Sequence, residues 1–177
     1  MLTLYPLNLF SFDYIFSTLD VIHKLDPFLR MATKKAKPNG QFEIQLAGAK
    51  EYQKQSYEKG EFHLAAIESD RGGFTPRGFS VNGHEEIFKP RMKQISQWLP
   101  LLEPYGLSFQ KGGAGADISG LKNQKGMLFG FKPDSQRYFD YHHTGIDNFD
   151  SVNKRELELG VAAMTSLVYL LDKYGLK

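Results

Sequence analysis

The chain has 177 residues, of which 41% are hydrophobic and 24% charged, and this composition is typical of one globular domain rather than of a disordered chain. Its 22 Lys and Arg nearly balance its 20 Asp and Glu, so the net charge of +2 argues against nucleic acid as the main partner. The absence of cysteine excludes disulfides, thiolate zinc sites, a cysteine nucleophile and iron–sulfur ligation. Any bound metal must therefore be held by His and carboxylate side chains.

Residues 1–16 are apolar enough to be tested as a targeting signal. They contain no Lys or Arg, Asp13 interrupts the apolar run, and no small-residue cleavage site follows. We therefore expect no secretory signal peptide. No apolar stretch approaches the roughly 20 residues that span a bilayer. The sequence accordingly predicts no membrane partner and, by default, a cytoplasmic location.

Hydrophobic periodicity and Gly/Pro punctuation predict strands that alternate with helices. In chain order, the expected elements are a helix over 17–29, a basic turn at 31–41, a helix over 47–57, a strand over 62–67, a loop over 71–78, a strand over 79–81, a helix over 84–103, a Gly-rich loop at 111–115, a strand over 126–131 and a helix over 154–174. Such alternation is typical of an α/β fold.

The last of these helices has the most regular pattern. Its apolar residues at helical spacing predict one inner stripe: Leu157, Val161, Met164, Val168 and Leu171. Gly175 follows at the position where a glycine commonly ends a helix. The sequence therefore predicts a long helix that lies on the sheet through this stripe.

Two loops that adjoin predicted strands carry carboxylates of interest. Asp70 follows an apolar strand, where ligands commonly bind in open α/β sheets, although a turn-capping role would explain it equally. Residues 112–120 are Gly-rich but match neither a dinucleotide fingerprint nor a phosphate loop. Asp117 in that segment is expected to open a short helix.

A third loop, residues 138–150, contains the densest cluster of metal-capable side chains. His142 and His143 adjoin Asp140, Asp147 and Asp150, and imidazole with carboxylate oxygens suits zinc. Adjacent residues of an extended segment point in opposite directions, so at most one of the two histidines should face a given site. The other is expected to pack or to hydrogen-bond beside it.

Together these motifs resemble one family, the co-catalytic zinc exopeptidases that include bacterial leucyl aminopeptidases and carboxypeptidase Q (plasma glutamate carboxypeptidase). The matching segments are LAGAKEY at 46–52, AAIESDRGGFTPRGF at 65–79, GGAGADISGL at 112–121 and YFDYHHTGIDNFDSVNKREL at 138–157. The carboxypeptidase Q branch is the most similar. The resemblance implies a three-layer α/β/α sandwich with a mixed, mostly parallel sheet, and two zinc ions bridged by a water. Family members are often secreted or periplasmic.

The resemblance also implies roles by position. Asp70 matches an Asp that binds one zinc, and His143 matches the His that binds the other, because the family ligand is the His followed by Thr or Ser. Asp147 completes that His-Thr-x-x-Asp pattern. Asp117, His142 and Asp147 are expected to lie beside the ligands rather than to bind metal.

Several family features are missing from this chain. In the matching alignment, Glu43 keeps a ligand position, but Phe42 occupies the position of the glutamate that acts as general base. The metal-bridging Asp would fall near Phe10 or Ser11, no His-x-Asp pair precedes it, and the family's first strands are absent. We therefore assign no catalytic residue and expect one zinc or none. Residues 1–45 are interpreted as an atypical head, and residues 46–177 as the C-terminal part of a zinc peptidase domain.

These observations favour a truncated or degenerate member of the family that is inactive as an isolated chain, for example through a frame shift in its gene. Two alternatives stay open, an active zinc exopeptidase with rearranged ligands and a non-catalytic binding module on the same fold. An unrelated α/β protein would have to match all the motifs in order by chance. A peptide or dipeptide is the expected substrate of an active form. A sheet without its first strands also predicts self-association through an exposed edge.

Overall fold

The computed structural model describes residues 47–142 and 144–176. The chain divides into two compact units, residues 1–52 and 53–177. Residues 47–52, which belong to the first unit, form the start of helix α2 (Ala47–Glu58). Within the part of the chain that is described, no helix is both long enough and apolar enough to cross a membrane.

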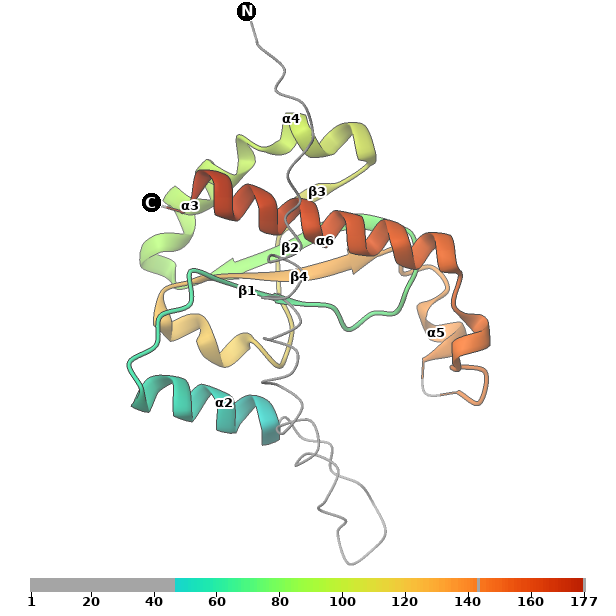
Figure 1. The fold of residues 1–177 in the computed structure, drawn as a ribbon, viewed down its shortest axis with the longest axis horizontal. Coiled ribbons are helices and arrows are strands. Elements are labelled where there is room, and N and C mark those ends of the chain that lie inside the picture. The colour runs from blue at the N-terminus through green and yellow to red at the C-terminus, as the bar shows by residue number, and fades with distance from the viewer. Residues whose placement is uncertain (1–46, 143, 177) are drawn as a thin grey trace, which may run out of the picture. The chain divides into compact units, whose positions relative to one another are not determined.

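Helices and strands alternate along the chain (Figure 1). The strands are β1 (Ala65–Glu68), β2 (Pro76–Gly83), β3 (Ser108–Lys111) and β4 (Met127–Pro133). The α-helices after α2 are α3 (Glu85–Ser96), α4 (Leu99–Leu102), α5 (Tyr138–Tyr141) and α6 (Lys154–Tyr174). Three short 3-10 helices complete the list: η1 (Glu103–Tyr105), η2 (Ser119–Gln124) and η3 (Phe149–Ser151).

The described strands form one mixed sheet in the order β1-β4-β2-β3. β1 pairs with β4 in parallel, β2 pairs with β3 in parallel, and the two pairs meet at the antiparallel contact between β2 and β4. This arrangement confirms the predicted α/β fold with a mixed, mostly parallel sheet.

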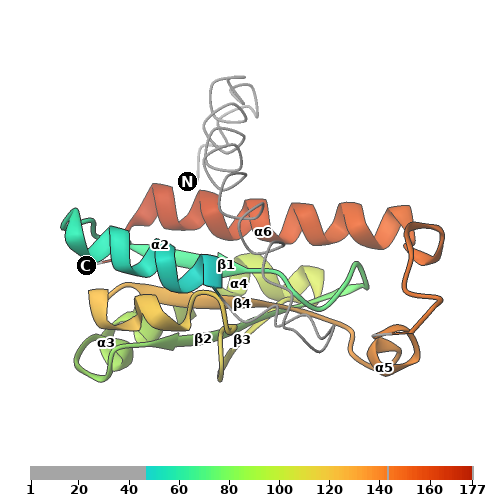
Figure 2. The ribbon, with the colours of Figure 1, turned by 90° about the horizontal axis from the view of Figure 1, so that it is seen from below.

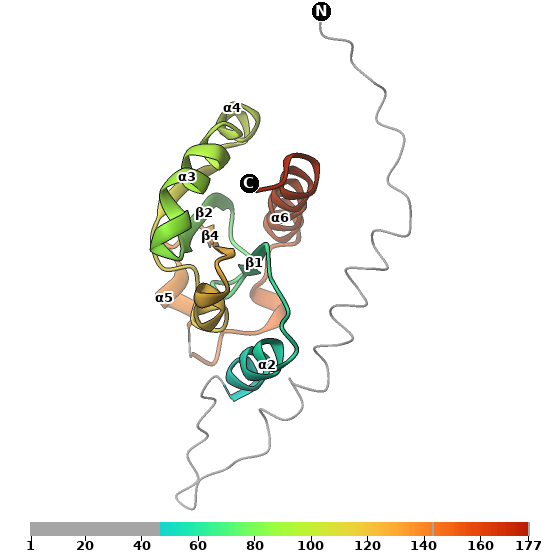
Figure 3. The ribbon, with the colours of Figure 1, turned by 90° about the vertical axis from the view of Figure 1, so that its left-hand side faces the viewer.

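One face of the sheet carries most of the core. Phe79 is opposite Phe131 on β4 and Phe109 on β3, and its ring centroid lies 5.9 Å and 6.1 Å from theirs. Val81 is opposite Phe129 on the same face. Helices α3, α4 and α6 cover this face, and their buried side chains form one cluster with these residues (Figure 3). The area removed from water, at about 25 cal/mol per Å² of apolar surface, is the main stabilising contribution here.

The opposite face is covered by η2 and by residues 53–58 of α2 (Figure 2). The Gln53 amide donates to the Gly120 carbonyl oxygen at 2.6 Å. Gln124, buried at the end of η2, donates to the Ser56 hydroxyl and lies 2.5 Å from His63 Nδ1. Leu121 of η2 is also buried, so both polar and apolar contacts attach this second layer. Helices flank the sheet on both sides, as predicted.

The predicted strands are partly misplaced. β1 begins at Ala65 rather than at residue 62, and β2 begins at Pro76, inside the predicted loop. Gly78 allows this early start, because a side chain there would overlap the backbone of Ser108 on β3. β3 itself was not predicted, since its four residues contain a single apolar side chain, Phe109, and therefore show no alternation.

The predicted helix over 84–103 is interrupted. Helix α3 ends at Ser96, and α4 begins again at Leu99. Pro100 accounts for the break, because it has no N–H to donate to the Ser96 carbonyl oxygen and its ring would crowd that oxygen. The break allows Trp98 and Leu102 to join the core.

Helix α6 has the predicted bounds, and Gly175 ends it with a positive φ of 63°. The predicted inner stripe, however, is wrong in part. Leu157, Val161 and Val168 are 44%, 53% and 43% exposed, and the buried residues are Gly160, Ala163, Leu167, Leu170 and Leu171. The helix is rotated so that its smallest residues face the aromatic layer. A Cβ at Gly160 would lie only 3.3 Å from the ring of Phe131.

Candidate functional site

A cavity of about 100 Å³ lies beyond the carboxyl end of β1. Three segments build it: the loop after β1, helix α5 with the turn after it, and η3 with the start of α6. It is lined by Asp70, Gly72, Gly73, Phe74, Tyr138, Tyr141, His142, Asp147, Ser151, Val152 and Asn153. The structure thus places three of the predicted site residues, Asp70, His142 and Asp147, around one cavity.

The end of β1 is fixed by a residue that the sequence analysis missed. The carboxylate of Glu68 accepts hydrogen bonds from the backbone N–H groups of Ala116, Asp117 and Ile118, at 3.1, 2.9 and 3.2 Å. Gly115, with a φ of 131°, must be glycine because a Cβ there would overlap this carboxylate. A glutamate that ends an apolar strand, together with a glycine in a polar loop, is the only sequence signal of this contact. Glu68 thereby fixes the strand end from which Asp70 follows.

Asp117 lies apart from the cavity. Its backbone N–H is one of the three that donate to the Glu68 carboxylate. Asp117 precedes η2, which begins at Ser119. The side chain of Asp117 is not among those that line the cavity. The structure therefore does not bring Asp117 together with Asp70, and it supports a structural role for the loop that contains Asp117.

His142 is oriented by helix α5. Its backbone N–H donates to the Tyr138 carbonyl oxygen at 2.9 Å, and its ring stacks on the Tyr138 ring with centroids 4.6 Å apart. The Tyr138 hydroxyl lies 3.5 Å from His142 Nε2. The His142 ring is thereby held at the wall of the cavity. His143 and Glu43 lie outside the residues that the structure describes.

Short turns place Asp147 at the cavity. The Thr144 hydroxyl donates to the Tyr141 carbonyl oxygen, and the backbone N–H of Asp147 donates to the Thr144 carbonyl oxygen. Asn148 and Asn153 then cap η3 and α6 through their side-chain oxygens. These caps satisfy backbone N–H groups at the starts of η3 and α6, beside the cavity.

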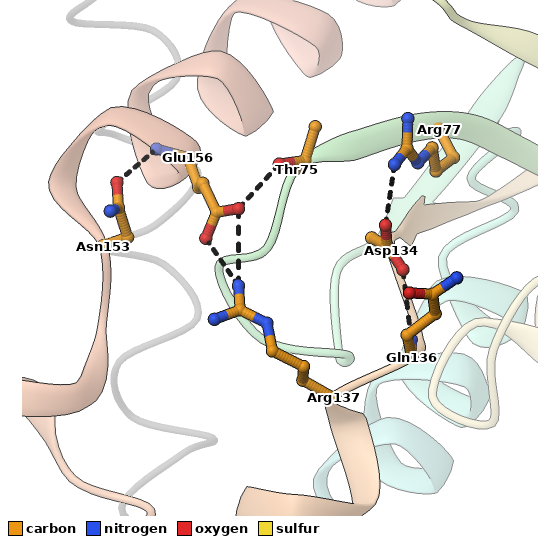
Figure 4. A network of polar contacts seen from close by, with 7 residues as sticks. All are labelled: Thr75, Arg77, Asp134, Gln136, Arg137, Asn153 and Glu156. Atoms are coloured by element: carbon orange, nitrogen blue, oxygen red, sulfur yellow. Dashed lines mark hydrogen bonds and ion pairs between the residues drawn. The ribbon is translucent and has the colours of Figure 1, made fainter.

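Behind the cavity, a polar network joins the three segments (Figure 4). Glu156, in the first turn of α6, accepts hydrogen bonds from the Thr75 hydroxyl at 2.6 Å and from Arg137 at 3.1 Å. Nearby, Arg77 at the start of β2 donates to Asp134 just after β4, at 2.7 Å. This hydrogen bond, with a second from the Gln136 backbone, holds the pKa of Asp134 below its ordinary value.

The donor types at the cavity, carboxylate and imidazole, are those that zinc prefers. Among residues 47–142 and 144–176, however, no three His, Asp or Glu side chains come close enough together to hold a metal ion. The described residues thus fit zinc in kind but supply an incomplete ligand set. The two further predicted ligands, His143 and Glu43, fall outside them.

The fold is similar to that of a solved peptidase, the Peptidase M28 precursor from Shewanella amazonensis SB2B. The two agree with a TM-score of 0.63 and 27% sequence identity over 76% of this chain and 30% of that chain. No protein-family model matches the chain, and no curated protein sequence matches it. The chain thus corresponds to about a third of the neighbour's length, and the likeness supports a metallopeptidase-like family for it.

Proposed function

We propose that the chain is a truncated or degenerate member of a zinc-dependent aminopeptidase or dipeptidase family, closest to the carboxypeptidase Q branch. The parent reaction is hydrolysis of a peptide bond by metal-activated water. The observation that carries the proposal is the cavity beyond β1, which gathers Asp70, His142 and Asp147 on an M28-like sheet. In this proposal, Asp70, His143 and Glu43 are the residues that would hold zinc.

Zinc bound there would polarise the peptide carbonyl group and lower the pKa of the attacking water. The chain's own residues would orient the ligands. In this proposal Asp147, whose backbone the Thr144 turn fixes, would orient the metal-binding His143, while His142 packs on Tyr138. Such outer partners fix the ring orientation of a metal-bound His.

The isolated chain is proposed to be inactive because it lacks a proton acceptor at the base position. Phe42, which matches that position, cannot take a proton from water. A positioned general base contributes typically about 10²–10⁴-fold in rate, so its loss alone would suppress turnover strongly. The proposal therefore separates metal binding, which can persist, from catalysis, which should not.

Metal content and turnover, measured on the same protein, test the proposal. The full chain would be dialysed with zinc, analysed by mass spectrometry for bound metal, and assayed on an aminoacyl chromogenic substrate. We expect one zinc or less per chain, loss of that zinc in Asp70→Asn, and no turnover. Asp117→Asn is the matched control, because Asp117 does not line the cavity, and it should keep the metal.

Two outcomes would contradict the proposal in different ways. Two zinc ions per chain with chelator-sensitive turnover would show an active exopeptidase with rearranged ligands. Equal zinc binding by the wild type and by Asp70→Asn would show that Asp70 does not hold the metal.

A further inference from the structure

We infer that Glu156 is a positioning residue whose carboxylate holds the three walls of the cavity in register. Its relevance to zinc rests on the proposed function, but its effect on the walls does not. We call Glu156, Thr75 and Arg137 the Glu156 brace.

The brace begins with a carboxylate that is held at a helix start. The backbone N–H of Glu156 donates to Asn153 Oδ1 at 3.1 Å, so the capped first turn of α6 fixes where the side chain emerges. That side chain is only 22% exposed. Its Oε1 accepts from the Thr75 hydroxyl at 2.6 Å, and Oε2 accepts from Arg137 Nη2 at 3.1 Å (Figure 4). One carboxylate therefore contacts two segments that are distant in sequence.

Arg137 extends the brace to the cavity. Its guanidinium lies over the Phe74 ring, 5.2 Å from the centroid, and the Phe74 ring lies 5.8 Å from that of Tyr141. Phe74 and Tyr141 both line the cavity. A cation above an aromatic face is attracted to it, so the guanidinium that pairs with Glu156 also fixes the ring.

Thr75 fixes the remaining wall. The residues just before it, 70–74, contribute four lining residues, including Asp70. The Thr75 carbonyl oxygen accepts from the Asp134 N–H at 2.7 Å, which attaches the end of this loop to the end of β4. Asn153, the cap of α6, lines the cavity from the third side. Glu156 therefore contacts all three walls, Thr75 and Arg137 through its carboxylate and Asn153 through its backbone N–H.

The brace contributes to local geometry more than to global stability. Arg137 is 54% exposed, and ion pairs at such positions contribute little to unfolding equilibria. The walls, in contrast, are built from the loop after β1, the one-turn helices α5 and η3, and the first turn of α6. Loss of the brace should therefore loosen the walls while leaving the sheet intact.

Hydrogen exchange of the metal-free full chain tests this inference directly. Two amides report on the walls: His142, which donates to Tyr138, and Asp134, which donates to Thr75. We expect both to exchange about tenfold faster in Glu156→Ala. Glu156→Gln should give a smaller change, because its amide oxygen can still accept from Thr75. Amides of β4 in the sheet should not change.

Glu86→Gln is the matched control, since Glu86 forms an exposed ion pair with Lys125 away from the cavity. It should leave both reporter amides unchanged. Unchanged exchange of His142 and Asp134 in Glu156→Ala would overturn the inference, whatever the metal result.

Zinc titration of the same variants separates this inference from the proposed function. If the wild type binds zinc, Glu156→Ala should raise the Kd by about 10–100-fold, which is the usual cost of losing an outer partner of a metal site. If the wild type binds no zinc but the walls still loosen, the proposed function fails and the positioning role stands. If zinc binds equally to all variants and exchange is unchanged, the positioning role fails alone.

Discussion

Glu68 and Gly115 lie in close contact, and the glycine leaves the space that the glutamate carboxylate occupies. The carboxylate needs backbone N–H groups within reach, and it obtains three of them because the loop passes so close that no side chain fits at residue 115. The contact fixes the end of β1, two residues before Asp70. This polar contact between distant parts of the sequence thereby positions a residue of the candidate site.

Gly115→Ala should destabilise the protein by about 2 kcal/mol or more, because the added Cβ overlaps the Glu68 carboxylate and φ is 131°. Gly113→Ala is the matched control in the same loop. A Cβ there meets nothing within 4 Å, so its effect should be small. Urea denaturation would compare the two free energies of unfolding. Equal values would show that the overlap is relieved by loop movement.

At the scale of elements, Arg77 and Asp134 join the ends of the antiparallel strands β2 and β4. Arg77 lowers the pKa of Asp134 in the folded state. The ionised carboxylate therefore stabilises the folded state at pH values above the ordinary pKa of Asp. This stabilisation is lost as the pH falls through the lowered pKa of Asp134. Arg77→Met should therefore raise the Asp134 pKa toward its ordinary value. An NMR titration of the side-chain carboxyl would measure the shift. An unchanged pKa would assign the lowering to the Gln136 N–H.

Helix α6 shows what a sequence pattern can and cannot determine. Its bounds follow from local chemistry, an Asn cap at one end and a glycine at the other, and they are confirmed. Its rotation depends on the partner surface. Gly160, where a Cβ would lie 3.3 Å from the Phe131 ring, and Ala163 are buried, and the sequence of the helix alone does not indicate which of its faces meets the sheet. The break at Pro100, by comparison, was available from the sequence.

At the scale of the whole molecule, the alternation of strands and helices predicted the α/β class, and the family resemblance implied the mixed sheet. The ends of two strands and the unpredicted β3 depended on tertiary contacts that short apolar runs do not encode. For the candidate site, the sequence identified Asp70, His142 and Asp147, which line one cavity. It missed Glu68 and Glu156, because each acts through hydrogen bonds to residues distant in sequence: Glu68 contacts residue 116, 48 positions away, and Glu156 contacts Thr75, 81 positions away. The roles of His143 and Glu43 stay predictions.

The expected self-association concerns the surface of the second unit. Within the described sheet, β1 is an edge strand, and edges of this kind can pair with another chain. The outer side of α6 adds exposed Leu157, Val161 and Val168. We propose that a second copy of the chain covers this apolar surface, because exposed apolar side chains and an edge strand are features through which protein chains associate.

Sedimentation over a range of protein concentrations would measure this association. We expect the mean mass of the wild type to rise with protein concentration. In the double variant with Val161→Lys and Val168→Lys, the same rise should need about tenfold higher concentration or more, because two charges would have to be desolvated in the contact. Tyr105→Lys is the control, as Tyr105 is 77% exposed on the separate element η1 and its replacement should change nothing. A wild type that stays monomeric with a cooperative melt at every concentration would contradict the proposal. A double variant that associates like the wild type would instead locate the contact away from α6, at the edge of β1.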